Sequence, residues 1–425
     1  TGGTYGGDCG NVTINGGTLT ATSKEYGCDG IGQGYGMNNP ATNTEVSING
    51  GTVTADGKHL GINAKELDIN PNRQRIKVVA GSSEANATEI PGSPFAETKN
   101  ITSDVSSSKY FHSEGLPNLI VTGDPNGYTY ENGVVTITGG GEYTIQMADG
   151  VTTTTDCIYV TSPEAVTITL NGVNIKTEDY CAAMELAGDG AVTLKLAGEN
   201  KLQSTAYKAG IQQDNKEAPL FIESASEDST STDGRLTAIG GHGSAGIGGC
   251  GIEMMTDNGN NGGNVTINGG TIIAEGDPEC AAGIGGGLDG KGGTVCIHNG
   301  MVTATGNIGI GGGASSSDTP NPNGGRLVVY GGTVTAVGEA AGVSSNTELI
   351  AYPIVGNQIE VKVGDDEASA TAAQGSPFTE PTTITDFATN YHYFHSETSI
   401  IPVYSISASP SSLNFDSKPY GDTTS

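Results

Sequence analysis

The acidic residues that border one group of extended segments are the first candidates for chemistry. Asp156 precedes Cys157, Asp179 precedes the comparable segment from Cys181 onward, and Asp189 lies at the next corner of the chain. If these segments stack, their carboxylates come close together and repel one another unless a cation neutralises them. Calcium prefers six to eight oxygen ligands. We therefore expect Ca²⁺ near Asp156, Asp179 and Asp189; the alternative is that these are solvated surface acids.

Tyrosines on the same segments are candidates for contact with sugars. Sugar sites combine an aromatic ring with planar polar groups, and the sequence has no Trp to supply that ring. Tyr159, Tyr180 and Tyr207 fall on successive repeats beside the acids and could take its place. The competing interpretation is that these rings only pack at the rim of the fold.

A polysaccharide-cleaving enzyme is the alternative to a binding protein. Elimination needs calcium beside a Lys or Arg base, and inverting hydrolysis needs two carboxyl groups roughly 6.5–9.5 Å apart. The available bases are Lys195, Lys201, Lys208 and Arg235. None belongs to a recognisable catalytic motif, and ordinary solvated charges explain them as well. We therefore expect no catalysis.

A repeated stretch must position these residues. Residues 263–274 read as two extended segments around a corner, and residues 282–287 add a third, glycine-flanked segment. Related copies occupy residues 10–21 and 30–32, 44–55, 293–304 and 309–311, and 325–336. Copies begin roughly 26 to 45 residues apart, as in solenoid proteins. An array of β-hairpins would explain the corners but not the third segment, so a parallel β-helix is favoured.

The residues within one copy support this interpretation. Val265 and Ile267 alternate with Thr266, which directs the two apolar side chains to one face of a strand. Asn268 and the glycines after it permit the backbone conformations that a sharp corner needs. In a parallel β-helix the equivalent residues of successive coils stack at ~4.8 Å, and the coil is expected to be right-handed.

Two further segments define the domain boundaries. Residues 75–114 and 358–397 align without a gap, and both end in Tyr-Phe-His-Ser-Glu. Exposed solenoid ends must be covered, so these aromatic-rich segments fit caps, and His112 and His395 are expected to make structural hydrogen bonds. We predict the closing part of one β-helix domain at 1–115 and a near-complete second domain at 116–400. Residues 401–425 are expected to begin an immunoglobulin-like β-sandwich module.

Composition narrows the function classes. The 425 residues carry 18 Lys and Arg against 47 Asp and Glu, a formal charge of −29, which disfavours nucleic acid and anionic membranes. No apolar run is long enough to span a membrane as a helix, so no membrane insertion is expected. The cysteines form no spaced framework, so we expect small buried apolar residues rather than bridges or zinc ligands; they are Cys9, Cys28, Cys157, Cys181, Cys250, Cys280 and Cys296.

A family resemblance adds to this interpretation. The segments 166–174 and 192–200, with the Gly-Gly-Thr-Val-Thr-Ala and Gly-Ile-Gly-Gly-Gly copies, resemble a bacterial family of extracellular carbohydrate-binding β-helices. That family is similar in shape to pectate lyases and binds polygalacturonate-type polymers with calcium. The resemblance implies a secreted or cell-surface bacterial protein that binds polysaccharide or acts as an adhesin, as a monomer within a larger multidomain chain. A purely structural surface stalk is a further alternative.

Overall fold

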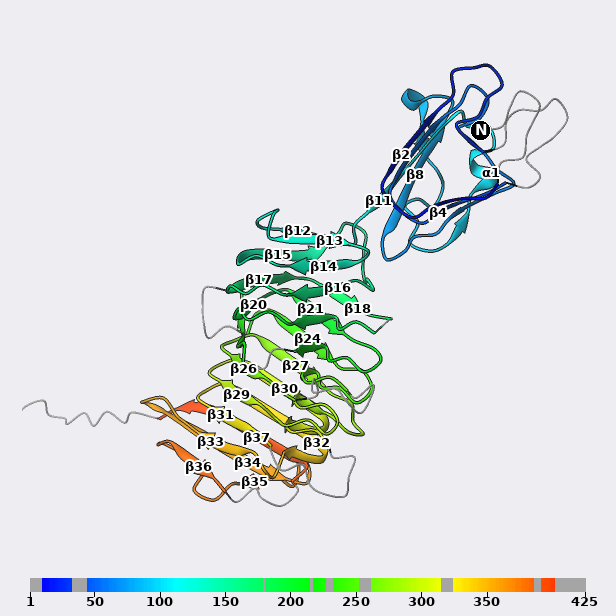
Figure 1. Cartoon of the computed structure of the whole chain (residues 1–425). Coiled ribbons are helices and arrows are strands. Elements are labelled where there is room, and N and C mark those ends of the chain that lie inside the picture. The colour runs from blue at the N-terminus through cyan, green and yellow to red at the C-terminus, as the bar shows by residue number, and fades with distance from the viewer. Residues whose placement is uncertain are drawn as a thin grey trace, which may run out of the picture.

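A computed structural model describes residues 10–32, 44–178, 180–214, 217–226, 232–251, 261–314, 324–385 and 391–401. Figure 1 shows two stacks of strands, one blue to cyan and one cyan to orange. No sheet in the described part contains strands of both stacks, so we call residues 10–116 the first domain and residues 119–401 the second domain. Within the described residues no helix is long and apolar enough to cross a membrane.

The first domain consists of stacked coils that end in a cap. Its ladders of paired strands comprise β1 (Val12–Ile14), β4 (Glu45–Ile48), β7 (Glu66–Ile69) and β10 (Lys99–Asn100); then β2 (Thr18–Thr22), β5 (Thr52–Asp56), β11 (Tyr110–Leu116), β8 (Arg75–Gly81) and β9 (Thr88–Glu89); and β3 (Ile31–Gly32) with β6 (Ile62–Asn63). A 3₁₀ turn (Glu84–Asn86) and the short helix α1 (Thr102–Val105) lie between the cap strands.

The second domain opens with antiparallel strands. β12 (Leu119–Thr122) pairs with β15 (Gly141–Met147), and β13 (Tyr128–Glu131) pairs with β14 (Val134–Ile137). Tyr143 is buried, and its ring meets that of Tyr128 edge to face, with centroids 6.2 Å apart. These rings cover the start of the apolar interior, where an uncapped solenoid would expose its core.

Parallel strands follow in three ladders. One continues from β15 through β17 (Val166–Asn171), β20 (Val192–Ala197), β23 (Leu220–Ser224), β26 (Asn264–Ile267), β29 (Thr294–Ile297), β31 (Arg326–Val329) and β33 (Glu348–Ala351). A second runs from β14 through β16 (Cys157–Val160), β19 (Met184–Leu186), β22 (Ile211–Gln213), β25 (Ile247–Gly248) and β28 (Ala282–Gly285). The third comprises β18 (Asn174–Lys176), β21 (Glu199–Gln203), β24 (Arg235–Ile239) and β27 (Thr271–Glu275). The second and third ladders both pair with β30 (Met301–Gly311), which pairs with β32 (Thr333–Val343).

The register of the first of these ladders confirms the predicted parallel β-helix. The first apolar residue of each coil lies beside its counterpart in the next coil, and all are buried; the column is Val166, Val192, Leu220, Val265, Val295 and Leu327. Because the neighbouring strands run parallel, an array of hairpins is ruled out for this part of the chain. Stacking like residues fills a narrow interior with Val, Ile, Leu and Ala, which suits a sequence that is only 5% aromatic.

Glycine is required at the predicted corners for two reasons: the backbone conformation there and the closeness of the neighbouring coil. Gly270 and Gly300 have φ values of 86° and 95°, in the left-handed region that disfavours other residues. A Cβ on Gly300 would lie 2.6 Å from the carbonyl oxygen of Gly270 in the preceding coil. The Asn-Gly-Gly corner therefore sets both the turn and the close approach of coils.

Both domains close in the same way. In the first domain β11 runs antiparallel to β5 and β8, and in the second β37 (Tyr393–Ile400) runs antiparallel to β32 and β34 (Asn357–Gly364). β35 (Thr371–Ala372) and β36 (Thr382–Ile384) complete the second cap. His112 Nδ1 lies 2.9 Å from Thr54 Oγ1, and His395 Nδ1 lies 3.0 Å from Thr335 Oγ1. These contacts confirm the structural hydrogen bonds predicted for both histidines.

Two predicted segments lie at the margins of the described chain. Residues 1–9 of the predicted first domain are outside the described residues. Apart from Ile401, so is the whole predicted immunoglobulin-like fragment at 401–425.

Candidate functional site

A polar column on the outer face of the second ladder is the candidate site. Tyr159 of β16 lies beside Glu185 of β19, which lies beside Gln212 of β22. The adjacent residues Ile158 and Met184 are fully buried, so strand alternation directs Tyr159 and Glu185 away from the core. One tyrosine and two polar side chains therefore follow one another along the helix axis.

Glu185 is at the centre of this column. The Nζ atom of Lys208 lies 3.9 Å from Glu185 Oε2, and the carboxyl groups of Glu185 and Asp214 are in hydrogen-bonding contact. Burial, reinforced by the charge of Asp214, raises the pKa of Glu185 to about 7, although the Lys208 charge opposes the change. A negative charge beside a partly buried carboxyl group disfavours its ionisation, so Glu185 retains its proton to higher pH than an ordinary glutamate.

Gln212 supplies an amide to the same site. Its Nε2 atom donates a hydrogen bond of 2.7 Å to Asp214 Oδ1. Its side chain is only 2% exposed, and Oε1 has no hydrogen-bond partner within the described structure. A buried acceptor without a donor costs about 1–3 kcal/mol, so a hydroxyl or water bonded to Oε1 would be stabilising.

The structure brings one of the three predicted tyrosines, Tyr159, to this site. Tyr159 is half-buried beside Glu185, and the charge of Lys208 acts on its phenol. Tyr207 directly precedes Lys208, and its ring packs edge to face on His242 with centroids 5.5 Å apart. Tyr180, 62% exposed, precedes β19 on the neighbouring coil and makes no described ring contact.

Two of the three predicted calcium ligands lie within the described residues. Asp156 is fully buried before β16; the Tyr130 hydroxyl donates to its Oδ2, and Asn118 Nδ2 donates to its Oδ1 at 3.4 Å. Burial raises the pKa of Asp156, while these hydrogen bonds and the Arg73 charge act in the opposite direction. Asp189 is exposed beyond β19, at the far end of that strand pair, and Asp179 lies outside the described residues.

Within the described residues, no group of three or more His, Cys, Asp or Glu side chains is arranged to hold a metal ion. Asp156 instead faces an arginine of the first domain. Its position before a strand was visible in the sequence, but its partner was not, because Arg73 belongs to another domain.

The expectation that the cysteines form no bridges is wrong for one pair. Cys157 and Cys181 form a disulfide, with their Cα atoms 6.6 Å apart. The bridge forms because Cys157 begins β16 and Cys181 precedes the neighbouring strand β19, so stacking places them on adjacent coils. The Nη1 atom of Arg73 lies 3.7 Å from Cys157 Sγ and 3.8 Å from Cys181 Sγ.

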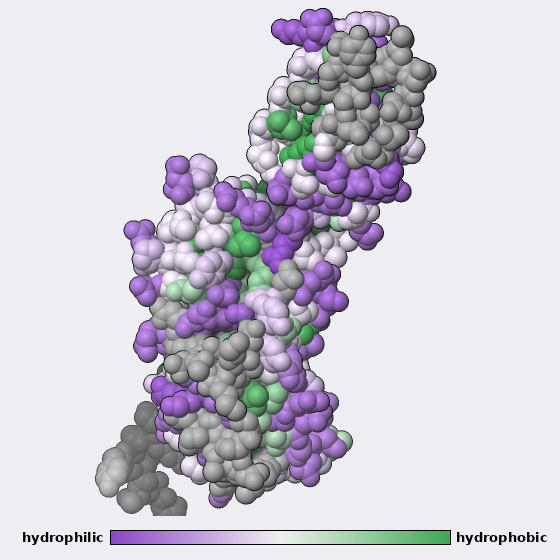
Figure 2. All heavy atoms as spheres, turned by 45° about the vertical axis from the view of Figure 1, so that its right-hand side comes forward, coloured by the Kyte–Doolittle hydropathy of each residue, from purple (hydrophilic) through white to green (hydrophobic). Residues whose placement is uncertain are grey.

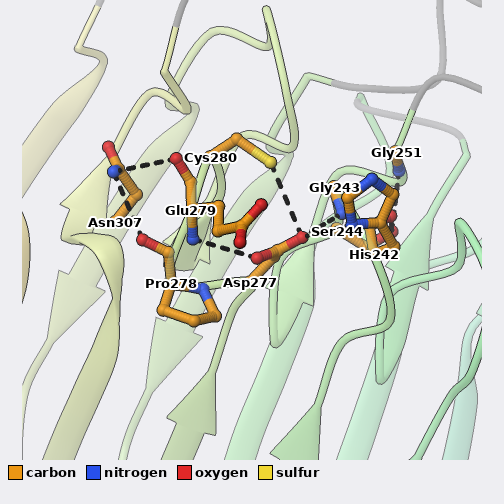
Figure 3. A network of polar contacts seen from close by, with 9 residues as sticks. All are labelled: His242, Gly243, Ser244, Gly251, Asp277, Pro278, Glu279, Cys280 and Asn307. Atoms are coloured by element: carbon orange, nitrogen blue, oxygen red, sulfur yellow. Dashed lines mark hydrogen bonds and ion pairs between the residues drawn. The ribbon is translucent and has the colours of Figure 1, made fainter.

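A second polar cluster, around Asp277, contains Cys, His and Asp but is not arranged for nucleophilic catalysis. Figure 3 shows Asp277 between Cys280 and His242. Asp277 Oδ2 lies 3.0 Å from His242 Nδ1 and also accepts the N–H of Gly243 at 2.6 Å. Burial and the Asp277 charge raise the pKa of Cys280 to about 12, so it stays a thiol and donates to that carboxylate. A nucleophilic cysteine needs a lowered pKa, and this cluster therefore anchors a loop.

Of the four basic residues considered for catalysis, only Lys208 reaches the candidate site. Lys195 Nζ lies 3.9 Å from Glu223 Oε1 on the first ladder. Lys201 and Arg235 are exposed on the third ladder. Glu185, Gln212 and Asp214 were not among the predicted site residues; the available signal was the alternation in β16 and β19, where Tyr159 and Glu185 are the less buried residues between buried ones.

Comparison with known proteins supports the architecture. A model of the beta helix repeat matches residues 12–35, 46–64 and 265–288. No curated protein and no solved structure matches the chain. Parts of both domains thus carry the beta helix repeat, in agreement with the long parallel ladders.

Proposed function

We propose that this chain is a non-catalytic polysaccharide-binding or adhesion protein of a bacterial surface or secretion, and that sugars bind on the Tyr159–Glu185–Gln212 column. The supporting observation is the column itself: an outward tyrosine in register with a carboxyl group and an amide, with Lys208 beside them. Tyrosine offers an apolar ring with a polar edge, and the Glu185 carboxyl group can bond to hydroxyls. Gln212, which is only 2% exposed, supports the site by its hydrogen bond to Asp214. The Cys157–Cys181 disulfide favours a location outside the cytoplasm.

An acidic, pectin-like polymer is the ligand class that we put forward. Lys208 offers a cation to a sugar carboxylate, but the formal charge of −29 opposes the approach of an anionic chain. Calcium would relieve that repulsion by bridging carboxylates of polymer and protein, since it binds clusters of oxygen ligands. Affinity is therefore expected to rise when calcium is added.

Binding of oligogalacturonides to the purified protein, with calcium and with chelator, tests this proposal. Tyr159→Ala should weaken binding about tenfold, which corresponds to about 1.4 kcal/mol. Tyr352→Ala is the matched control, because Tyr352 is 45% exposed on another ladder. If oligogalacturonides do not bind, or if both variants bind like the wild type, the column is not the site, and a surface stalk becomes the better description.

One observation favours an enzyme as the second candidate: a carboxyl group with a pKa of about 7 lies beside Lys208. Such a group can act as a general acid at neutral pH. Glycosidases use two carboxyl groups held ~5–5.5 Å or ~6.5–9.5 Å apart, whereas Glu185 and Asp214 interact directly enough for Asp214 to raise the pKa of Glu185. Release of new reducing ends from polygalacturonate, abolished by Glu185→Gln, would establish the enzyme instead of the binding protein.

A further inference from the structure

The junction between the two domains contains a hollow that the proposed sugar site does not use. Its volume is about 490 Å³, and both domains line it. From the first domain come Asn15, Asn72 and Gln74, and from the second come Tyr130 and Asn132. A second hollow of about 560 Å³ lies beside it, and Arg73 lines both.

The walls of the first hollow are fixed by contacts across the junction. Arg73 lies on the Cys157–Cys181 disulfide, and the Nδ2 atom of Asn118 donates to the Arg73 carbonyl oxygen at 3.2 Å. Gly133 is required here, because a Cβ would lie 2.6 Å from Arg73 Cβ and 2.8 Å from Asp156 Oδ1. Arg75 adds hydrogen bonds to the carbonyl oxygens of Asp149 at 3.0 Å and of Pro117 at 3.1 Å. A ligand would therefore meet a preorganised cleft.

A ladder of amide side chains ends in this cleft. Asn70 Nδ2 donates to Asn49 Oδ1 at 3.1 Å, and Asn49 Nδ2 donates to Asn15 Oδ1 at 2.7 Å. Asn15 is the last member and is exposed, so its own Nδ2 is directed outward from a hydrogen-bonded chain. Gln74 is tied to the same ladder, because its Nε2 donates to the Asn49 carbonyl oxygen at 3.4 Å. Donors at the end of such a chain are polarised by the bonds behind them.

The charge of the cleft favours a neutral ligand. The Arg73 guanidinium contacts the disulfide sulfur atoms, and its charge acts on the buried Asp156. Glu131 is the one carboxylate among the described residues that line the hollow. Figure 2 shows hydrophilic side chains where the two domains meet. Amide groups and glycine backbone, with a tyrosine on the opposite wall, suit hydroxyl groups rather than phosphates or carboxylates.

We propose that the junction is a second carbohydrate site, selective for a neutral oligosaccharide held by Asn15, Gln74 and Asn132 against Tyr130. The site forms only when both domains are in contact, so the chain would engage two glycan segments at once. This inference extends the proposed polysaccharide-binding function but uses different residues and a different sugar class.

Isothermal titration of the whole chain with cellohexaose, xylohexaose and mannohexaose tests the proposal. At least one of these neutral sugars should bind with one site per chain, and Asn15→Ala combined with Gln74→Ala should weaken it at least about tenfold. Asn171→Ala is the matched control, because Asn171 is an exposed corner asparagine outside the cleft whose Nδ2 donates to Gln146 Oε1 at 3.4 Å. Circular dichroism confirms that each variant is folded.

The two proposals fail separately. Tyr159→Ala should leave binding of the neutral sugar unchanged, while the Asn15 and Gln74 variant should leave binding of hexagalacturonate unchanged. The junction site is overturned if none of the three neutral sugars binds, or if the double variant binds as the Asn171 control does. Failure of the wild type to bind hexagalacturonate, with binding of a neutral sugar retained, would instead refute the Tyr159 column.

Discussion

Arg73 of the first domain contacts Cys157 of the second, with Nη1 3.7 Å from Sγ. The same guanidinium reaches Cys181, and its charge acts on Asp156, which is fully buried. Burial raises the pKa of Asp156, and one of the charges that oppose this shift thus comes from outside its own domain. This contact makes the stability of the second domain depend on the first.

Arg73→Ala should therefore destabilise the second domain as well as loosen the junction. Removing the cation leaves Asp156 buried without its charge partner, at a cost of about 1–3 kcal/mol. Urea unfolding at pH 8 measures the loss, and small-angle X-ray scattering measures the wider range of domain orientations. Arg235→Ala is the control, because Arg235 is an exposed arginine in the sheet that contains Cys157. Unchanged stability and scattering would show that the junction does not depend on Arg73.

The raised pKa of Glu185 predicts a pH dependence of stability. Because the folded pKa of Glu185, about 7, lies above its ordinary value of 4.5, folding takes up a proton between these values. The stabilisation is complete below pH ~4.5 and is lost as the pH rises through about 7, a change on the order of 2–3 kcal/mol.

Glu185→Gln should remove this decline, since a neutral amide does not titrate. Urea midpoints measured from pH 4.5 to 8 give the comparison, with Glu223→Gln as the control for losing an acid beside a lysine. Parallel curves for the wild type and the Glu185 variant would mean that Glu185 is not the group that retains the proton.

Sequence alone was sufficient for the architecture but not for the site. Val265 and Ile267 alternate with Thr266, and an Asn-Gly-Gly corner follows them. Both features act over a few neighbouring residues, so the pattern predicts the strands and the corner directly. Tyr159 was found because it lies on a strand with the same alternation. Glu185 and Gln212 were not singled out, because their register with Tyr159 depends on loops of different lengths between coils.

Contacts between distant segments limited the prediction most. Asp156 was predicted as a metal ligand because stacked coils were expected to bring acids at equivalent positions together; the structure gives it Tyr130 and Arg73 as partners. The Cys157–Cys181 bridge was missed because the cysteines have no regular spacing, and only coil stacking brings them together.

Cys280 should be unreactive in the folded protein. With its pKa raised to about 12 from 9.0, the thiolate fraction at pH 8 is ~1,000-fold below that of an ordinary thiol. Iodoacetamide labelling followed by peptide mass spectrometry should leave Cys280 unmodified while the half-exposed Cys28 reacts. Asp277→Asn should speed labelling of Cys280, because it removes the neighbouring negative charge. Fast labelling in the wild type would return the Asp277 cluster to the list of candidate nucleophilic sites.

The matched caps predict that each domain unfolds with its own cap. Phe111 and Phe394 occupy the same position in β11 and β37, and both are buried in their domain's core. Phe111→Ala or Phe394→Ala should each cost about 3–5 kcal/mol, through lost apolar burial and the cavity left behind. In differential scanning calorimetry, Phe111→Ala should lower one transition and Phe394→Ala the other. Phe→Leu at either position should cost less, since it keeps most of the buried volume. A single transition that shifts equally in both alanine variants would mean that the Arg73 contact couples the two domains into one cooperative unit.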